Sequence, residues 1–177
     1  MKWIDFEYNG EILDLSHLHP FSWFLLQDKE GKHPARKYSF NVEFSMHCFT
    51  KQLLPAENPS ASLIYRGPKE ERVFCFERYE LSRQLPAIIM NIDKSVCWHT
   101  HHGHFFTIEL QNRQGVNVEY EVYFDVYKSG KGWLTLIVKS AYIRDAQHGT
   151  TQPRKRKIRF GVIARNRFEG KKLRPPR

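Results

Sequence analysis

Residues 118–145, VEYEVYFDVYKSGKGWLTLIVKSAYIRD, decide the fold. Valine, tyrosine or phenylalanine occupies every second position from Val118 to Val126, with acidic or tyrosine side chains between them. A period of two is the pattern of a strand with one buried face. The KSGKG segment suits a tight turn, because glycine adopts positive φ without steric cost. The residues after it are rich in β-branched and aromatic types, so the stretch predicts a long antiparallel hairpin.

Further strands are expected on both sides of a single helical segment. Residues 3–15 predict a hairpin with an Asn-Gly turn, which is the strongest short hairpin signal. Alternating apolar residues predict more strands, at 21–26, 38–49, 96–110 and 157–166.

The helix is expected over 79–92, where Leu81, Leu85, Ile88 and Ile92 form an apolar stripe at helical spacing. Pro86 leaves two alternatives open. The segment is either one kinked helix or two short helices, the second carrying Pro86 in its first turn.

These elements predict an α+β fold dominated by antiparallel sheet, with one main helix, kinked or split, packed on a roughly four-stranded C-terminal sheet. We expect a β-rich N-terminal subdomain over 1–75, a helix-plus-sheet unit over 76–166 and a basic flexible tail over 167–177.

Composition narrows the class of protein. Of 177 residues, 41% are apolar and 14% aromatic, which is enough to build a core. No apolar run reaches the roughly 20 residues of a membrane-spanning helix, and no secretory signal is visible, so we expect a cytoplasmic protein with no membrane contact. Three widely spaced cysteines argue against a disulfide framework and suggest buried, unreactive thiols.

Positive charge is concentrated at the C-terminal end. From Lys128 onward fifteen Lys and Arg residues face two carboxylates, a net charge of +13, whereas residues 1–127 sum to −4. One segment, Arg154 to Arg159, holds five cations in six residues. A basic surface of this kind is typical of binding to phosphate backbones.

The segment 99–104 holds four histidines. On one continuous strand, His99 and His101 would share one face, and His102 and His104 the other. Three interpretations stay open: a histidine-rich surface turn, acid–base or phosphate contact, and a zinc site. Zinc would need further ligands from His17, His19, His47 or Cys48, and no motif links them.

The end of the central hairpin carries a second candidate group. On a regular strand, Lys139, Ala141 and Ile143 face one side, and Ser140, Tyr142 and Arg144 the other. A hydroxyl, a phenol and a guanidinium in a row suit metal-independent phosphodiester cleavage, in which RNA supplies its own 2′-hydroxyl nucleophile. An ordinary polar strand face is the alternative.

Residues 78–166, with a Leu-Pro-containing helix followed by strands that end in Ser140-Ala141-Tyr142, resemble the barnase–EndoU–colicin–RelE superfamily of small RNases. The resemblance implies a helix packed on an antiparallel sheet and metal-independent RNA cleavage, often as a toxin. The whole chain is also similar to proteins of proteobacterial mobile elements, which fixes no activity.

The sequence thus predicts an RNA-binding protein, with RNA favoured over DNA, that acts as a metal-independent endoribonuclease and has no cofactor. The expected catalytic residues are His101, His104, Ser140, Tyr142 and Arg144. The expected nucleic-acid-binding residues are Lys139, Arg154, Lys155, Arg156, Lys157, Arg159, Arg165 and Arg167. The alternatives are a non-catalytic nucleic-acid-binding accessory protein and a zinc-stabilised binding module. The N-terminal part is a candidate surface for a protein partner such as an antitoxin.

Overall fold

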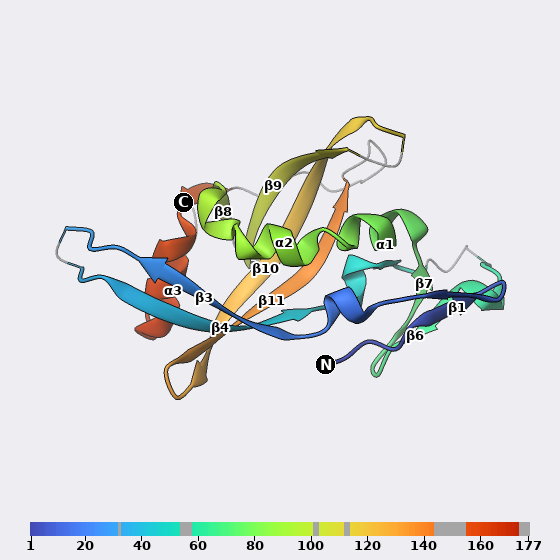
Figure 1. Ribbon diagram of the computed structural model, residues 1–177, viewed down its shortest axis with the longest axis horizontal. Coiled ribbons are helices and arrows are strands. Elements are labelled where there is room, and N and C mark those ends of the chain that lie inside the picture. Colours follow the sequence, from blue (N-terminus) through green and yellow to red (C-terminus); the bar gives the residue numbers. More distant parts are fainter. Residues whose placement is uncertain (32, 54–57, 101–102, 112–113, 144–154, 174–177) are drawn as a thin grey trace.

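The computed structural model describes residues 1–31, 33–53, 58–100, 103–111, 114–143 and 155–173 (Figure 1). A seven-stranded sheet lies at the centre of the fold, in the spatial order β12-β8-β9-β10-β11-β4-β3. Neighbouring strands are antiparallel except β11 and β4, which are parallel. The strands are β3 (Phe21–Gln27), β4 (Arg36–Phe44), β8 (Cys97–Thr100), β9 (Gly103–Gln111), β10 (Asn117–Gly130), β11 (Trp133–Ile143) and β12 (Arg156–Ile158).

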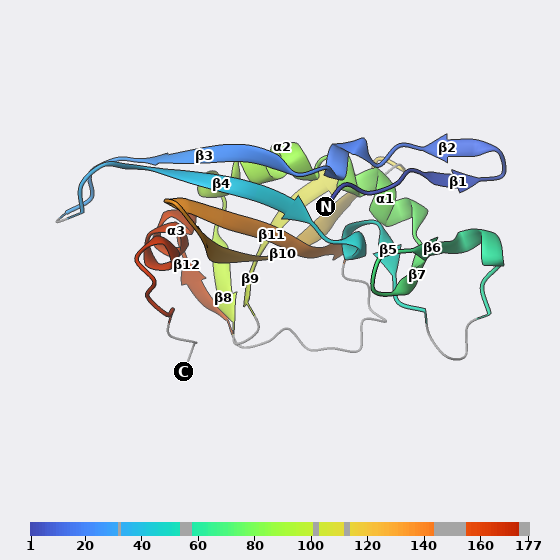
Figure 2. The ribbon, with the colours of Figure 1, turned by 90° about the horizontal axis from the view of Figure 1, so that it is seen from below.

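The predicted α+β class, with mostly antiparallel sheet, is confirmed, but the sheet is larger than the four strands expected. β3 and β4, which lie within the predicted N-terminal part, extend it at the β11 edge. The β3–β4 connection and the β1–β2 hairpin lie at opposite ends of the molecule (Figures 1 and 2).

The hairpin of β10 and β11 is confirmed. Its turn is built from Gly130, Lys131 and Gly132, all at positive φ. The pairing runs from Gly130↔Trp133 to Tyr120↔Ile143. A register shift between Tyr123 and Phe124 interrupts the alternation, because Tyr123 pairs with Ser140 and Phe124 with Val138. Lys139 is therefore the extra residue of a bulge.

The N-terminal part forms two small sheets and short 3-10 turns. β1 (Phe6–Tyr8) pairs with β2 (Glu11–Leu13) around the predicted Asn9-Gly10 turn, where both residues have positive φ. The second sheet has the order β5-β7-β6. Its strands are β5 (Thr50–Lys51), β6 (Ile64–Arg66) and β7 (Glu71–Phe74), and the 3-10 turns are Ser16–Leu18, Met46–Cys48 and Ala61–Leu63.

The predicted helical segment forms two short helices, α1 (Phe76–Ser82) and α2 (Leu85–Met90), followed by a 3-10 turn at Ile92–Lys94. Pro86 lies in the first turn of α2. Backbone N–H groups in that turn make no hydrogen bond within the helix, so the lack of an N–H in proline costs nothing there. The second of the two alternatives therefore holds.

The predicted strand over 157–166 is wrong beyond Ile158, because α3 spans Phe160–Phe168. Both periods are present in this stretch. Alternate positions are apolar, as in a strand, but Phe160, Ile163 and Ala164 also follow helical spacing, and all three are buried. Burial of that helical face against β10 and β11 decides the outcome. The predicted tail from residue 167 also begins inside this helix.

The predicted strand over 96–110 is a hairpin instead. β8 and β9 are antiparallel neighbours, and their pairing sets His99 directly opposite His104. Gly103, which follows the two connecting residues, is a turn signal, but the predicted continuous strand ran through it. The two residues between the strands, 101 and 102, lie outside the described residues.

Alternate residues of β10 define two faces of the central sheet. The inner face carries Tyr120, Val122, Phe124 and Val126, all fully buried. α3 packs on it through Phe160, whose ring lies 6.0 Å from that of Phe124. The outer face is the opposite one and carries the side chains of the odd-numbered residues from 119 to 127.

Removal of the Phe160 ring tests this packing. The ring contacts Phe124, Phe40 and Trp23 at centroid distances of 5.6–6.0 Å. We expect Phe160→Ala to lower the free energy of unfolding in urea by about 3–5 kcal/mol, because it leaves a cavity in the core. Phe24→Ala is the control: that ring is 53% exposed, and its loss should cost less than about 1 kcal/mol. Equal losses would contradict the assignment of α3 to the core.

Candidate nucleic-acid interface

Four aromatic side chains cross the outer face of the sheet, one from each of β8, β9, β10 and β11. We call them the aromatic row: Trp98, Phe105, Tyr123 and Tyr142. Cross-strand pairing sets Trp98 opposite Phe105 and Phe105 opposite Tyr123, while Tyr142 pairs with Glu121, two residues from Tyr123. Phe105 and Tyr123 stack at 5.1 Å between centroids, and Tyr123 and Tyr142 at 5.6 Å. Phe105 is buried, and the other three rings are half-buried.

Cations lie against both ends of the aromatic row. The Lys155 ammonium is 4.7 Å from the Trp98 ring centroid and 5.6 Å from that of Phe105. The Lys157 ammonium is 5.6 Å from the Trp98 ring, and the cross-strand pairing of β12 with β8 sets these two residues directly opposite each other. At the other end, the Arg78 guanidinium lies 5.0 Å from the ring of Tyr142. These are cation–π distances.

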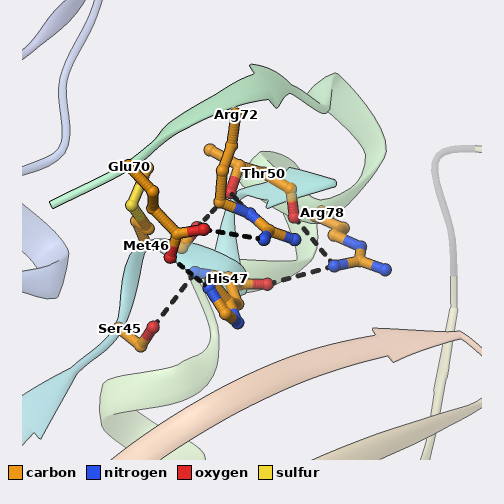
Figure 3. A network of polar contacts seen from close by, with 7 residues as sticks. All are labelled: Ser45, Met46, His47, Thr50, Glu70, Arg72 and Arg78. Carbon is orange, nitrogen blue, oxygen red and sulfur yellow. Dashed lines mark hydrogen bonds and ion pairs between the residues drawn. The ribbon is translucent and has the colours of Figure 1, made fainter. Parts of the chain in front are cut away.

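Arg78 is held in place by backbone carbonyls (Figure 3). Its Nη1 donates to the carbonyl oxygens of His47, at 3.2 Å, and Thr50, at 2.8 Å. The rest of the guanidinium points away from these carbonyls. A guanidinium has five N–H donors, so the group keeps donors for a further acceptor.

A polar network fixes the segment that supplies those carbonyls. The Arg72 side chain donates to the Thr50 hydroxyl at 3.0 Å and to Glu70 at 3.2 Å, and Glu70 lies 2.8 Å from the Nε2 of His47 (Figure 3). The Thr50 hydroxyl donates in turn to the Met46 carbonyl at 2.8 Å. Hydrogen bonds with His47 and then Arg72 lower the pKa of Glu70. The network therefore orients Arg78 through the backbone.

A buried carboxylate supports the middle of the row. The Tyr123 hydroxyl donates to Glu121 at 2.7 Å, and Glu121 is only 1% exposed. Burial, followed by hydrogen bonds with Glu121 and Tyr142, raises the pKa of Tyr123 far above its ordinary value. Tyr123 therefore stays protonated, and its phenol links Glu121 to Tyr142.

Lys139 lies beside the row and is locally neutralised. Its ammonium is 2.8 Å from the Asp125 carboxylate, which also accepts a hydrogen bond from Tyr127 at 3.0 Å. The hydrogen bond with Asp125 raises the pKa of Lys139. Because of the bulge, its ammonium reaches Asp125 on the outer face, so the predicted grouping of Lys139 with Ala141 is wrong.

The predicted catalytic residues are divided between the two faces. Ser140 and Tyr142 pair with Tyr123 and Glu121 on the outer face. His104 pairs with Phe124 on the inner face, is 1% exposed, and packs its ring 5.5 Å from that of Phe124. His101 and Arg144 lie outside the described residues.

His104 and His99 form a buried pair. Their Nδ1 atoms are 3.1 Å apart, so one ring donates a proton and the other accepts it. Burial first, and then the neighbouring His99, lowers the pKa of His104 to about 4. The geometry replaces the predicted grouping of His99 with His101.

The predicted basic residues also separate. Lys155 and Lys157 lie at the aromatic row, whereas Arg156 pairs with His99 and therefore faces the other side of β12. Arg159 forms an ion pair with Glu30. The predicted strand over 157–166 would have carried Arg159 and Arg165, but Arg165 and Arg167 belong to α3. Arg154 lies outside the described residues.

Sequence reasoning selected Tyr142, Lys155 and Lys157 but missed Arg78, Trp98, Phe105 and Tyr123. Successive side chains of a strand point to opposite faces, so the burial expected for Phe124 places Tyr123 on the other face. That pattern could have predicted an aromatic side chain on the outer face. The contributions of β8 and β9 depend on a hairpin that the sequence did not reveal.

Within the described parts of the chain, no three His, Cys, Asp or Glu side chains gather as metal ligands. Burial raises the pKa of the Cys48 and Cys97 thiols to about 12, and Cys75 is half-buried. Among the described helices, none has the length and apolar character that a bilayer crossing requires.

Fold and interface together define a basic α+β protein built on a mixed seven-stranded sheet. The model of the YjaZ family matches residues 5–168. Protein YjaZ of Escherichia coli (strain K12) is 36% identical over 179 residues, which cover 99% of this chain and 96% of that protein. The chain therefore belongs to the YjaZ family. No solved structure matches it. The resemblance to the barnase–EndoU–colicin–RelE superfamily stays a prediction.

The buried histidine pair predicts a loss of stability in mild acid. The folded-state pKa of His104 is about 4, against an ordinary 6.5, so the unfolded chain binds the proton more readily. The stability contributed by neutral His104 is complete above pH 6.5 and is lost as the pH falls toward 4. We expect this loss to reach about 3 kcal/mol. His104→Phe should remove most of it in urea titrations at pH 7.0 and 4.5.

Burial also lowers the pKa of His17, so His17 likewise makes the protein less stable as the pH falls. This contribution is present in both the wild type and the His104→Phe variant. The comparison between wild type and His104→Phe therefore isolates the buried pair. An unchanged pH dependence in the variant would contradict the assignment.

Proposed function

We propose that this protein binds single-stranded RNA on the outer face of the central sheet. The observation that carries the proposal is the aromatic row with cations against both of its ends. Bases stack on aromatic rings of any kind, and a phosphate backbone follows cations that border such rings. Trp98 and Tyr142 would stack on bases, while Lys155, Lys157 and Arg78 contact phosphates.

Single strands suit this face better than duplexes. A duplex keeps its bases stacked inside, so its rings are not available to aromatic side chains, whereas an unpaired strand can splay them onto a sheet. The C-terminal concentration of positive charge, +13 from Lys128 onward, adds a sequence-independent attraction for phosphates. The preference for RNA over DNA rests on the resemblance of residues 78–166 to small RNases.

A second candidate function is metal-independent cleavage of the bound RNA. It is favoured by the arrangement around Tyr142, whose ring lies 5.0 Å from the Arg78 guanidinium and whose phenol connects through Tyr123 to the buried carboxylate of Glu121. A guanidinium can stabilise the charge that develops on a phosphate during cleavage. In this arrangement the groups near the phosphate are Tyr142, Ser140 and Arg78, and His104 is not among them because it lies on the inner face.

Binding is tested by fluorescence anisotropy of a labelled single-stranded RNA in excess EDTA. We expect Trp98→Ala to weaken binding by about 5- to 100-fold, the usual effect of losing one base-stacking ring. Lys157→Gln should weaken binding and reduce the dependence of log K on log salt by about 0.7.

The β3–β4 pair offers matched controls, because the Lys37 ammonium lies 4.3 Å from the exposed ring of Phe24. Phe24→Ala and Lys37→Gln should leave binding within about twofold of wild type. If the Phe24 and Lys37 variants lose as much affinity as the Trp98 and Lys157 variants, the proposed face is wrong. A duplex RNA of the same sequence tests the preference for single strands, and a single DNA strand of that sequence tests the preference for RNA. Both should bind more weakly than the single-stranded RNA.

Cleavage is tested by incubating the protein with total RNA in excess EDTA and following fragment sizes on a gel. If the second function holds, Tyr142→Phe and Ser140→Ala should each lower the rate by about 10- to 1,000-fold, since they remove groups that orient the phosphate. Tyr127→Phe is the matched control, because Tyr127 also lies on the outer face but is 49% exposed and bonds to Asp125. Intact RNA with wild-type protein would exclude cleavage and leave the binding proposal standing.

A further inference from the structure

A basic cavity is bounded on one side by the edge strand β12. Its volume is about 780 Å³, and it is lined by β12, α3, the 3-10 turn at Ile92–Lys94 and the chain at residues 172–173. This volume falls within the range of small-molecule sites. Arg156 faces the cavity, since its pairing sets it opposite His99, which also lines the wall.

The charge of the cavity wall is strongly unbalanced. Five cations and one carboxylate, Asp93, line it. The cations are Lys94, Arg156, Lys157, Arg159 and Lys172. Like charges brought together in a concave wall repel one another, and a bound anion relieves that repulsion.

Local contacts account for only part of this charge. Arg159 forms an ion pair with Glu30, and Lys94 donates to the side-chain carbonyl of Asn91 at 2.7 Å. Within the described part of the chain, no carboxylate lies within ion-pair distance of Arg156 or Lys172, and both side chains belong to exposed residues. These two cations are therefore available to an anion.

The rest of the wall suits an organic group attached to the anion. Val96, Ile158, Val162 and Leu173 provide apolar surface beside the cations. Apolar walls with a few convergent polar groups are typical of sites for cofactor-sized molecules. Inorganic phosphate alone would use the cations but leave this surface unoccupied.

We propose that the cavity binds a phosphate monoester of a nucleotide, with the phosphate held by Arg156 and Lys172 and the nucleoside against the apolar wall. A monoester carries a charge of about −1.5 to −2 at neutral pH and three acceptor oxygens, which suits several cations better than a single carboxylate would. The same chemistry has two sources, a free nucleotide and the terminal phosphate of an RNA strand. The cavity shares Lys157 with the aromatic row, but Trp98 and Lys155 are not part of its wall.

Isothermal titration of the full chain with adenosine 5′-monophosphate tests the site. We expect the monophosphate to bind at least about tenfold more tightly than adenosine, since it adds charge-assisted hydrogen bonds. The double variant Arg156→Gln/Lys172→Gln should weaken its binding by about 10- to 100-fold. Lys171→Gln removes one positive charge from the residue next to Lys172, but Lys171 pairs with Glu169 and does not line the cavity, so this variant should leave binding within about twofold.

Competition distinguishes the two sources. Displacement of the nucleotide by an oligonucleotide with a terminal phosphate, but not by one with hydroxyl ends, supports an RNA end as the ligand. Displacement by neither supports a free nucleotide. Equal affinity for adenosine and its monophosphate, or an equal loss in Lys171→Gln and the double variant, would overturn the proposal. Thermal unfolding of the variants confirms that they are folded. Binding of the hydroxyl-ended oligonucleotide, which should depend on Trp98, is measured separately, so failure of the nucleotide site is distinguishable from failure of strand binding.

Discussion

The burial of alternate side chains of β10 determines both the core and the exposed face of the central sheet. Val122, Phe124 and Val126 are fully buried and form the floor on which Phe160 of α3 packs. Because the side-chain period of a strand is two, the intervening residues must face the other way. The outer face, with Tyr123 at its centre, is thus a consequence of building the core. A one-residue slip of the register would turn the apolar side chains to the outer face and the odd-numbered side chains toward the core. Both the packed core and the aromatic row would then be lost.

The parts of the fold that local patterns determine were predictable, and the parts that long-range packing determines were not. The β10–β11 hairpin has both its period and its turn in one continuous stretch, and the Asn-Gly turn of β1–β2 is equally local. The start of α3 was missed because its apolar residues fit a strand as well as a helix, and contact with β10 and β11 decides between them. The β8–β9 turn was missed because Gly103, a turn signal inside the histidine-rich segment, was interpreted as part of one continuous strand.

In the candidate interface, too, local sequence patterns predicted some residues, and long-range packing placed the others. Tyr142 was found because its neighbours on β11 are chemically unusual for a strand, and Lys155 and Lys157 because they belong to a dense basic run. Trp98 and Arg78 come from segments whose place beside the row depends on strand order and on the network around Glu70. Strand pairing and carbonyl contacts between distant residues are not visible in one sequence. The same pairing moved His104 away from Tyr142, to the inner face.

Photo-cross-linking of the full chain to a single-stranded RNA that contains 4-thiouridine, followed by mapping of the linked peptides, tests directly whether the strand binds on the outer face. If the outer face binds the strand, cross-links will be found on the aromatic row, above all at Trp98 and Tyr142, whose rings are half-buried at its two ends. Cross-links confined to the β3–β4 pair, or to the basic residues of α3, would contradict the account.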